Sequence, residues 1–101
     1  MDKRLKDSHV DSLFEAILTL KTKKELYQFF EDVSTVKELK ALAQRFEVAK
    51  KLSQGEKYET IVQETGASSA TISRVKRYLN YGADGYRLAL SRVKVKGQGS
   101  K

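Results

Sequence analysis

Residues 58–79 read YETIVQETGASSATISRVKRYL, and the fold is most readily inferred from them. It contains two short helical patterns separated by a tight turn at Gly66, which is the layout of a helix-turn-helix. Glycine permits so sharp a turn because it has no Cβ to clash with the backbone. Ala67 is small enough for the two helices to approach closely, and Ile61 and Val62 are predicted to bury the first helix.

The second of these helices has an apolar side and a polar side. Its apolar residues are Ile72, Val75, Tyr78 and Leu79, after a cap at Ser68 or Ser69, and we expect Ile72 and Val75 to hold it against the first helix. Its outward residues are then Ser68, Ser69, Ala70, Ser73, Arg74 and Arg77. Short side chains let a helix backbone approach base edges, and hydroxyl groups and helix N-termini bind bases or phosphates. Arg74, Lys76 and Arg77 follow one to two turns later, where they are predicted to contact the flanking phosphates. An ordinary helical hairpin with a serine-rich start is the alternative.

The segments around the hairpin are also helical in pattern. Apolar residues over 10–18 follow the i, i+3, i+4, i+7 spacing of an amphipathic helix. Threonine followed three residues later by glutamate, at 22–25 and at 35–38, predicts two further helix starts. The second of these helices is expected to end near Ser53, before Gly55, and a weaker sixth helix follows the turn at 82–85. Because no strand pattern competes, the fold class predicted is all-α with six helices.

Composition and charge narrow the function. The chain has 101 residues, no Cys and one His, so it has no disulfide framework, no thiolate zinc site and few routes to a His-based centre. The first 67 residues carry twelve basic and twelve acidic side chains, whereas residues 68–101 carry eight basic ones against Asp84 alone. This localised excess is typical of nucleic-acid binding, and a solvated basic tail is the alternative. No acid–base constellation suggests an enzyme, and we expect neither catalytic nor metal-binding residues.

The sequence also bears on location and domain organisation. No apolar run approaches the roughly 20 residues of a membrane span, and the charged N-terminus is unlike a signal peptide. We therefore expect a cytoplasmic protein. The length fits a single domain, predicted over residues 1–93 with the helix-turn-helix at about 58–79, and a flexible basic tail is predicted over 94–101.

Two stretches resemble a known family. Residues 35–52, TVKELKALAQRFEVAKKL, with Gly55, and residues 64–74, ETGASSATISR, are similar to the Trp repressor superfamily and within it to the TrpR-related YerC/YecD group. The resemblance covers about residues 13–90. It implies a bacterial, all-helical, intertwined homodimer whose second hairpin helix enters the major groove of duplex DNA. The family's Trp repressor binds paired half-sites in this way, with largely water-mediated base contacts.

The resemblance also assigns roles to residues. Those that match the groove-facing positions are Ser69, Ala70, Thr71 and Ser73. Arg45 and Arg74 match the two arginines that enclose tryptophan in Trp repressor. Val75, however, stands where the repressor has a glycine that leaves room for the indole, and Tyr78 stands where a serine helps to bind the ligand's amino group. The resemblance thus leaves room for a small-molecule corepressor of unknown identity but argues against tryptophan.

Three roles are then open to Arg45 and Arg74: binding another small anion, pairing with acidic side chains, or contacting DNA. For Arg45 the simplest alternative is an ion pair with Glu38 or Glu47. The aromatic residues of the first two predicted helices favour dimerisation, because a small domain does not easily bury so much apolar surface, although they could also fill a monomer core. These residues are Phe14, Tyr27, Phe29 and Phe30.

Together these observations predict a sequence-specific DNA-binding transcriptional regulator, a repressor that acts as a dimer on duplex DNA. The alternative from another class is a helical adaptor that binds an acidic protein partner without DNA.

Overall fold

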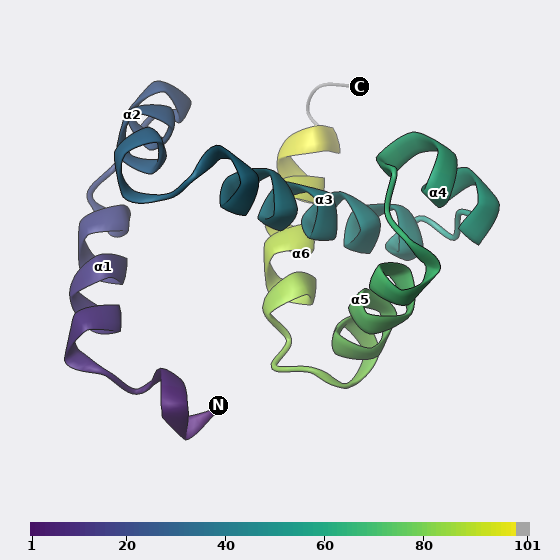
Figure 1. Cartoon of the computed structure of the whole chain (residues 1–101), viewed down its shortest axis with the longest axis horizontal. Helices are drawn as coiled ribbons and strands as arrows, with labels where there is room; N and C mark the ends of the chain where they lie inside the picture. Colours follow the sequence, from purple (N-terminus) through teal and green to yellow (C-terminus); the bar gives the residue numbers. More distant parts are fainter. Residues whose placement is uncertain (99–101) are drawn as a thin grey trace. The chain divides into compact units, whose positions relative to one another are not determined.

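The computed structural model describes residues 1–98, and it describes side chains as far as Val93. One short 3-10 helix and six α-helices make up the described part of the chain (Figure 1). They are η1 (Lys3–Leu5), α1 (Ser8–Leu18), α2 (Lys23–Val33), α3 (Val36–Ser53), α4 (Tyr58–Thr65), α5 (Ser69–Tyr81) and α6 (Gly85–Gln98). The prediction of an all-α fold with six helices is confirmed. Within residues 1–98, no helix is both long enough and apolar enough to cross a lipid bilayer.

Side-chain caps start α2 and α3 where the sequence predicts them. Thr22 Oγ1 accepts the Glu25 N–H at 3.1 Å, and Glu25 Oε1 accepts the N–H of Lys21 at 2.7 Å. At α3 the exchange is reciprocal, because Thr35 Oγ1 accepts the Glu38 N–H at 3.0 Å while Glu38 Oε1 accepts the Thr35 N–H at 2.8 Å. This second bond lowers the pKa of Glu38 below its ordinary value. The four bonds satisfy N–H groups that a helix start leaves without partners.

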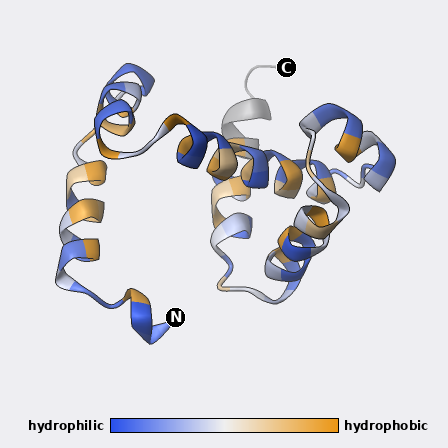
Figure 2. Ribbon diagram, viewed as in Figure 1, coloured by the Kyte–Doolittle hydropathy of each residue, from blue (hydrophilic) through white to orange (hydrophobic). Residues whose placement is uncertain are grey.

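The chain divides into two compact units, Met1–Leu39 and Lys40–Lys101. In the first unit, η1, α1 and α2 contain no buried residue. Phe14 of α1 is 55% exposed, and Tyr27 of α2 is also exposed; Figure 2 shows several apolar positions of α1 in orange. Phe29 and Phe30 meet edge to face, with ring centroids 5.4 Å apart. The helices of this unit therefore display amphipathic faces without a covered core.

The second unit has a small core to which α3, α4, α5 and α6 all contribute. Its buried residues are Val48 and Ala49 of α3, Ile61 of α4, Ala67 of the following turn, and Ile72, Val75 and Leu79 of α5. Partly buried Leu52, Tyr86 and Leu90 pack against them. Because the core is made from one stripe of each helix, it fixes which side of α5 points outward.

Two apolar residues of the hairpin lie outside the core. Val62, which was predicted to be buried, is 42% exposed, so that prediction was wrong, and Tyr78 is 55% exposed. Each is next in sequence to a core residue, Ile61 and Leu79 respectively, and one residue turns a helix by about 100°. Since neighbouring helices cover only one side of these short helices, the adjacent apolar residue is left outside.

Helix α6 extends further than its pattern indicates. It begins at Gly85, after a turn in which Asp84 has a φ of +66°, and it ends at Gln98 rather than near Val93. Residues 94–98 contain no proline, the residue that breaks a helix, and the helical backbone continues to Gln98 although Gly97 is a poor helix former. Residues 99–101 lie outside the described part of the chain, and the flexible tail over 94–101 stays a prediction.

Candidate nucleic-acid interface

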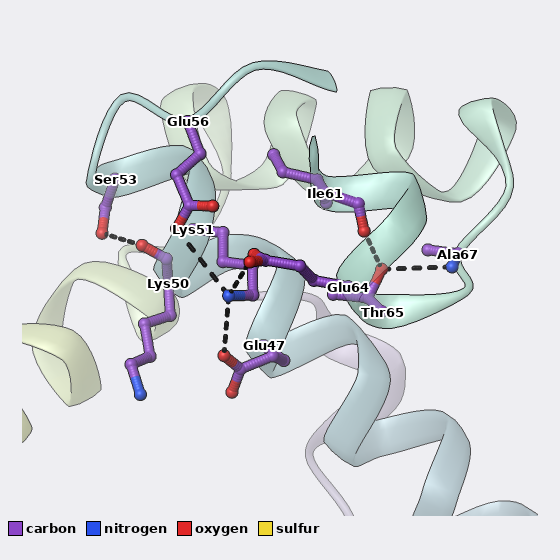
Figure 3. A network of polar contacts seen from close by, with 9 residues as sticks. All are labelled: Glu47, Lys50, Lys51, Ser53, Glu56, Ile61, Glu64, Thr65 and Ala67. Carbon is purple, nitrogen blue, oxygen red and sulfur yellow. Dashed lines mark hydrogen bonds and ion pairs between the residues drawn. The ribbon is translucent and has the colours of Figure 1, made fainter. Parts of the chain in front are cut away.

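A tight turn joins α4 to α5 and sets where the second helix of the pair begins. Helix α4 ends at Thr65 and is capped by Gly66, whose φ of +73° lies in the left-handed region, and the Gly66 N–H donates to the Val62 carbonyl at 2.9 Å. Thr65 Oγ1 donates to the Ile61 carbonyl at 2.6 Å and accepts the Ala67 N–H at 3.1 Å (Figure 3). These bonds satisfy backbone groups that the end of a helix otherwise leaves unpaired. The predicted role of Gly66 is confirmed.

Lys51 of α3 is the centre of an ion-pair network that ties α4 to α3. Its Nζ lies 2.7 Å from Glu64 Oε1, and 3.7 Å from a carboxylate oxygen of both Glu47 and Glu56 (Figure 3). The hydrogen bond to Glu64 is the main reason that the pKa of Lys51 is raised, and the same bond lowers the pKa of Glu64. Both shifts favour the charged pair. Lys51 is therefore occupied by three carboxylates and is not presented to an acidic partner.

The first turn of α5 contains most of the small polar residues predicted to read DNA. Ser68 is the N-cap, as predicted: its Oγ accepts the Thr71 N–H at 3.1 Å and donates to Thr71 Oγ1 at 3.1 Å. Ser69, Ala70 and Ser73 are exposed, whereas Thr71 is half-buried. The Ser68 and Thr71 hydroxyls are thus already bonded to each other, and the freer approach to this turn is over Ser69, Ala70 and Ser73.

One stripe of α5 combines exposure with uncompensated positive charge. Ala70, Arg74, Arg77 and Tyr81 follow one another at spacings of four, three and four residues, which places them on one helix face. This face is opposite the core stripe that contains Val75. Arg74 and Arg77 are exposed, and within the part of the chain that the structure describes, neither forms an ion pair. An approaching polyanion would therefore not have to displace an acidic side chain.

Lys76 occupies a different position from the two arginines. Its Nζ lies 5.6 Å from the ring centroid of Tyr58, the first residue of α4, in a cation–π arrangement. It is exposed but sits on the flank of α5, next to the buried Val75. The structure therefore brings Arg74 and Arg77 together on the outward stripe and places Lys76 beside it.

The two arginines matched to a ligand pocket lie in different surroundings. Arg45 of α3 is half-buried, and Arg74 of α5 is exposed. Arg45 forms no ion pair with any of the described residues, so the alternative of an ion pair with Glu38 or Glu47 is wrong. Glu38 is engaged in the cap of α3, and Glu47 faces Lys51, four residues along the helix. Arg45 and Glu47 are two residues apart and so do not face each other. The Val75 isopropyl group is part of the core, with 1% of its surface exposed.

Sequence reasoning missed two residues at this site. Gln44 of α3 donates from Nε2 to the Thr65 carbonyl at 3.1 Å and so supports the turn before α5. Tyr81 is 87% exposed at the end of the outward stripe. Its spacing of seven residues from Arg74 and four from Arg77 could have identified it. Nothing local could have found Gln44, which is 21 residues from its partner.

Fold and site together define an all-helical protein built around a helix-turn-helix. The family model described as Trp repressor protein matches residues 8–94, and the chain belongs to the Trp repressor family. The uncharacterized protein YerC of Bacillus subtilis (strain 168) is 55% identical over 91 residues, which are 90% of this chain and 88% of YerC. The predicted resemblance is thereby confirmed.

Solved structures agree with this assignment. A TrpR-like protein from Eubacterium eligens ATCC 27750 superimposes with a TM-score of 0.89 at 53% identity, covering 92% of this chain and 96% of that one. A second solved chain, from Staphylococcus aureus, gives a TM-score of 0.87 at 52% identity, covering 91% and 92% of the two chains. The helical arrangement described above is therefore that of TrpR-like proteins.

Proposed function

We propose that this protein is a sequence-specific DNA-binding transcriptional regulator, and that it acts as a repressor. The observation that carries the proposal is the outward stripe of α5, where Arg74 and Arg77 have no acidic partner among the described residues and follow small side chains at the helix start. Such a helix fits the major groove, which is wide enough to admit one. Membership of the Trp repressor family supports the same function.

In this mechanism affinity and sequence preference come from different parts of α5. Arg74 and Arg77, with Lys76 beside them, neutralise phosphates, and the counterions released make binding weaken as salt rises. Ser69, Ala70 and Ser73 let the helix backbone approach base edges, and they discriminate between sequences directly or through bridging water.

We further propose that the functional form is a homodimer joined through its first two helices. Helices α1 and α2 contain no buried residue, yet exposed apolar side chains such as Phe14, Leu18 and Tyr27 line them. Exposed apolar surface of this kind marks an interaction site, and a second copy of the same chain presents an equally apolar face. Two copies would place two recognition helices on one duplex.

A charge placed at the centre of this face tests the dimer. Phe14→Glu should shift the sedimenting species from dimer to monomer, because the new carboxylate would have to be buried without a partner. Glu15→Gln, an exposed change on the same helix, is the matched control and should leave the dimer intact. A wild-type protein that sediments as a monomer at micromolar concentration would contradict this part of the proposal.

Selection of bound sites from a random pool of duplexes tests the DNA-binding function. The expected result is a two-fold symmetric consensus, with half-sites about one helical turn apart. Failure to shift any duplex at low salt, combined with retention of the chain on an acidic protein column, would support the adaptor alternative and refute the proposal.

The position of Val75 also bears on regulation. Val75 is buried, and by the resemblance it stands where Trp repressor has the glycine that leaves room for the indole, so its isopropyl group would obstruct tryptophan. We therefore expect DNA binding without tryptophan, and any corepressor would be a smaller or differently shaped molecule.

A further inference from the structure

The C-terminal end of α5 is held by an arginine from the next helix. The last carbonyls of an α-helix have no N–H partner within the helix. At the end of α5 the Gly82 N–H donates to the Tyr78 carbonyl at 2.9 Å, and Arg87 Nε donates to the Leu79 carbonyl at 2.8 Å. Arg87 Nη2 also lies 3.4 Å from Asn80 Oδ1, a weaker contact. A side chain in the first turn of α6 therefore closes the helix that carries the outward stripe.

The charge of Arg87 suits this position. A helix C-terminus carries a partial negative charge, which a cation in the last turn stabilises. Helix α5 has no basic residue in its last turn, so Arg87 supplies the cation from α6. The connection between the helices is short, because only residues 82–84 join α5 to α6, and a Cβ at Gly82 would clash with the Tyr78 carbonyl of the last turn of α5. This short link and the Arg87 contacts together fix α6 against the end of α5.

We propose that Arg87 is a positioning residue for the DNA-reading helix and not a phosphate ligand. The inference rests on the proposed function, since it concerns how α5 is presented to the groove. Charge counting alone places Arg87 among the eight basic residues of 68–101, but its guanidinium is engaged with the Leu79 carbonyl. Arg87 holds the C-terminal end of α5, and the turn around Gly66 holds the N-terminal end. Loss of either anchor would let the outward stripe of α5 move relative to the duplex.

Amide hydrogen exchange in the free protein tests the anchor without DNA. Arg87→Lys keeps the charge but loses the planar donor fork, and Arg87→Gln loses the charge as well. In both variants the Leu79 carbonyl loses a hydrogen bond from a charged donor, so the last turn of α5 should open more readily. The Gly82 amide, which donates to the Tyr78 carbonyl in that turn, should therefore exchange about tenfold faster. Arg92→Gln removes a charge from the same helix and is the matched control, with wild-type exchange expected. Wild-type exchange in both Arg87 variants would overturn the proposal.

Binding measurements then separate positioning from phosphate contact. Both Arg87 variants should bind the selected duplex about tenfold more weakly, the same loss as in exchange. Their affinity for an unrelated duplex and their salt dependence should match those of Arg92→Gln. If Arg87→Lys binds like the wild type and Arg87→Gln loses affinity equally for both duplexes, with a salt slope lower by about one, Arg87 is a phosphate ligand and the proposal is wrong. A wild-type protein that shifts no duplex refutes the proposed function instead, and the exchange measurement still decides whether Arg87 anchors α5.

Discussion

Substituting Gly66 with alanine isolates the cost of the turn between α4 and α5. The φ of Gly66 is +73°, and a Cβ added there would meet only Gln44 Nε2, at 4.0 Å, which is ordinary contact. The penalty is therefore conformational: an L-residue in the left-handed region costs about 1–2 kcal/mol. Alanine also restricts the unfolded chain, which offsets part of this cost. We expect a net loss of about 1 kcal/mol, equivalent to about 4–8 °C in Tm for a domain of this size.

Two further variants test the reasoning behind this number. Gly55 has a φ of +79° and no atom within 4 Å of an added Cβ, so Gly55→Ala should cost the same although it lies outside the hairpin. Gly66→Asn should cost less, because asparagine adopts the left-handed conformation more readily. Urea unfolding at one fixed protein concentration provides the measurement, since dimerisation makes stability depend on concentration. If Gly66→Ala loses no stability, the turn is not left-handed at this residue. If it loses more than about 3 kcal/mol, the added Cβ is crowded.

Three other outcomes follow from the site. Arg77→Ala should weaken binding to all duplexes alike and lower the salt slope by about one; an unchanged slope in a salt titration would place Arg77 away from phosphate. Free tryptophan should not raise Tm, because the buried Val75 stands where an indole would need room; a saturable rise in Tm would show that tryptophan binds after all. The Lys51 bond lowers the folded-state pKa of Glu64 below its ordinary 4.5, so the pair stabilises the fold above that pH and the stability is lost as the pH falls through the folded pKa. Acid titration of Tm should therefore show a weaker decline in Lys51→Met than in the wild type, and equal declines would show that the pair does not act in solution.

Local signals predicted the helices well because they depend on neighbours in sequence. The capping threonines at 22 and 35 and the glycine at 66 act within about four residues, and each lies where the sequence places it. Periodicity also identified the apolar face of each helix. It could not say how much of that face a neighbouring helix covers, and for this reason Val62 was wrongly predicted to be buried and the exposure of Tyr78 was not foreseen.

The polar contacts of the site were harder to predict because they join residues distant in sequence. Lys51 meets Glu64 across 13 positions, and Gln44 meets Thr65 across 21. Both pairs depend on how α3 lies against α4, which no local pattern encodes. The alternative ion pair between Arg45 and Glu47 is not formed among the described residues for the converse reason: residues two apart in sequence point to different sides of a helix.

The uncovered faces of α1 and α2 have a consequence for synthesis. These helices precede in sequence the segments that build the core of the second unit. Ribosomes add about 5–20 residues per second, so roughly 3–11 s separate the completion of Val33 from that of Leu90. Helices α1 and α2 therefore emerge from the ribosome earlier than Leu90 by about that interval, and meanwhile their aromatic residues are within reach of chaperones. If the homodimer proposed above forms, neighbouring nascent chains on one messenger have time to pair before either core closes.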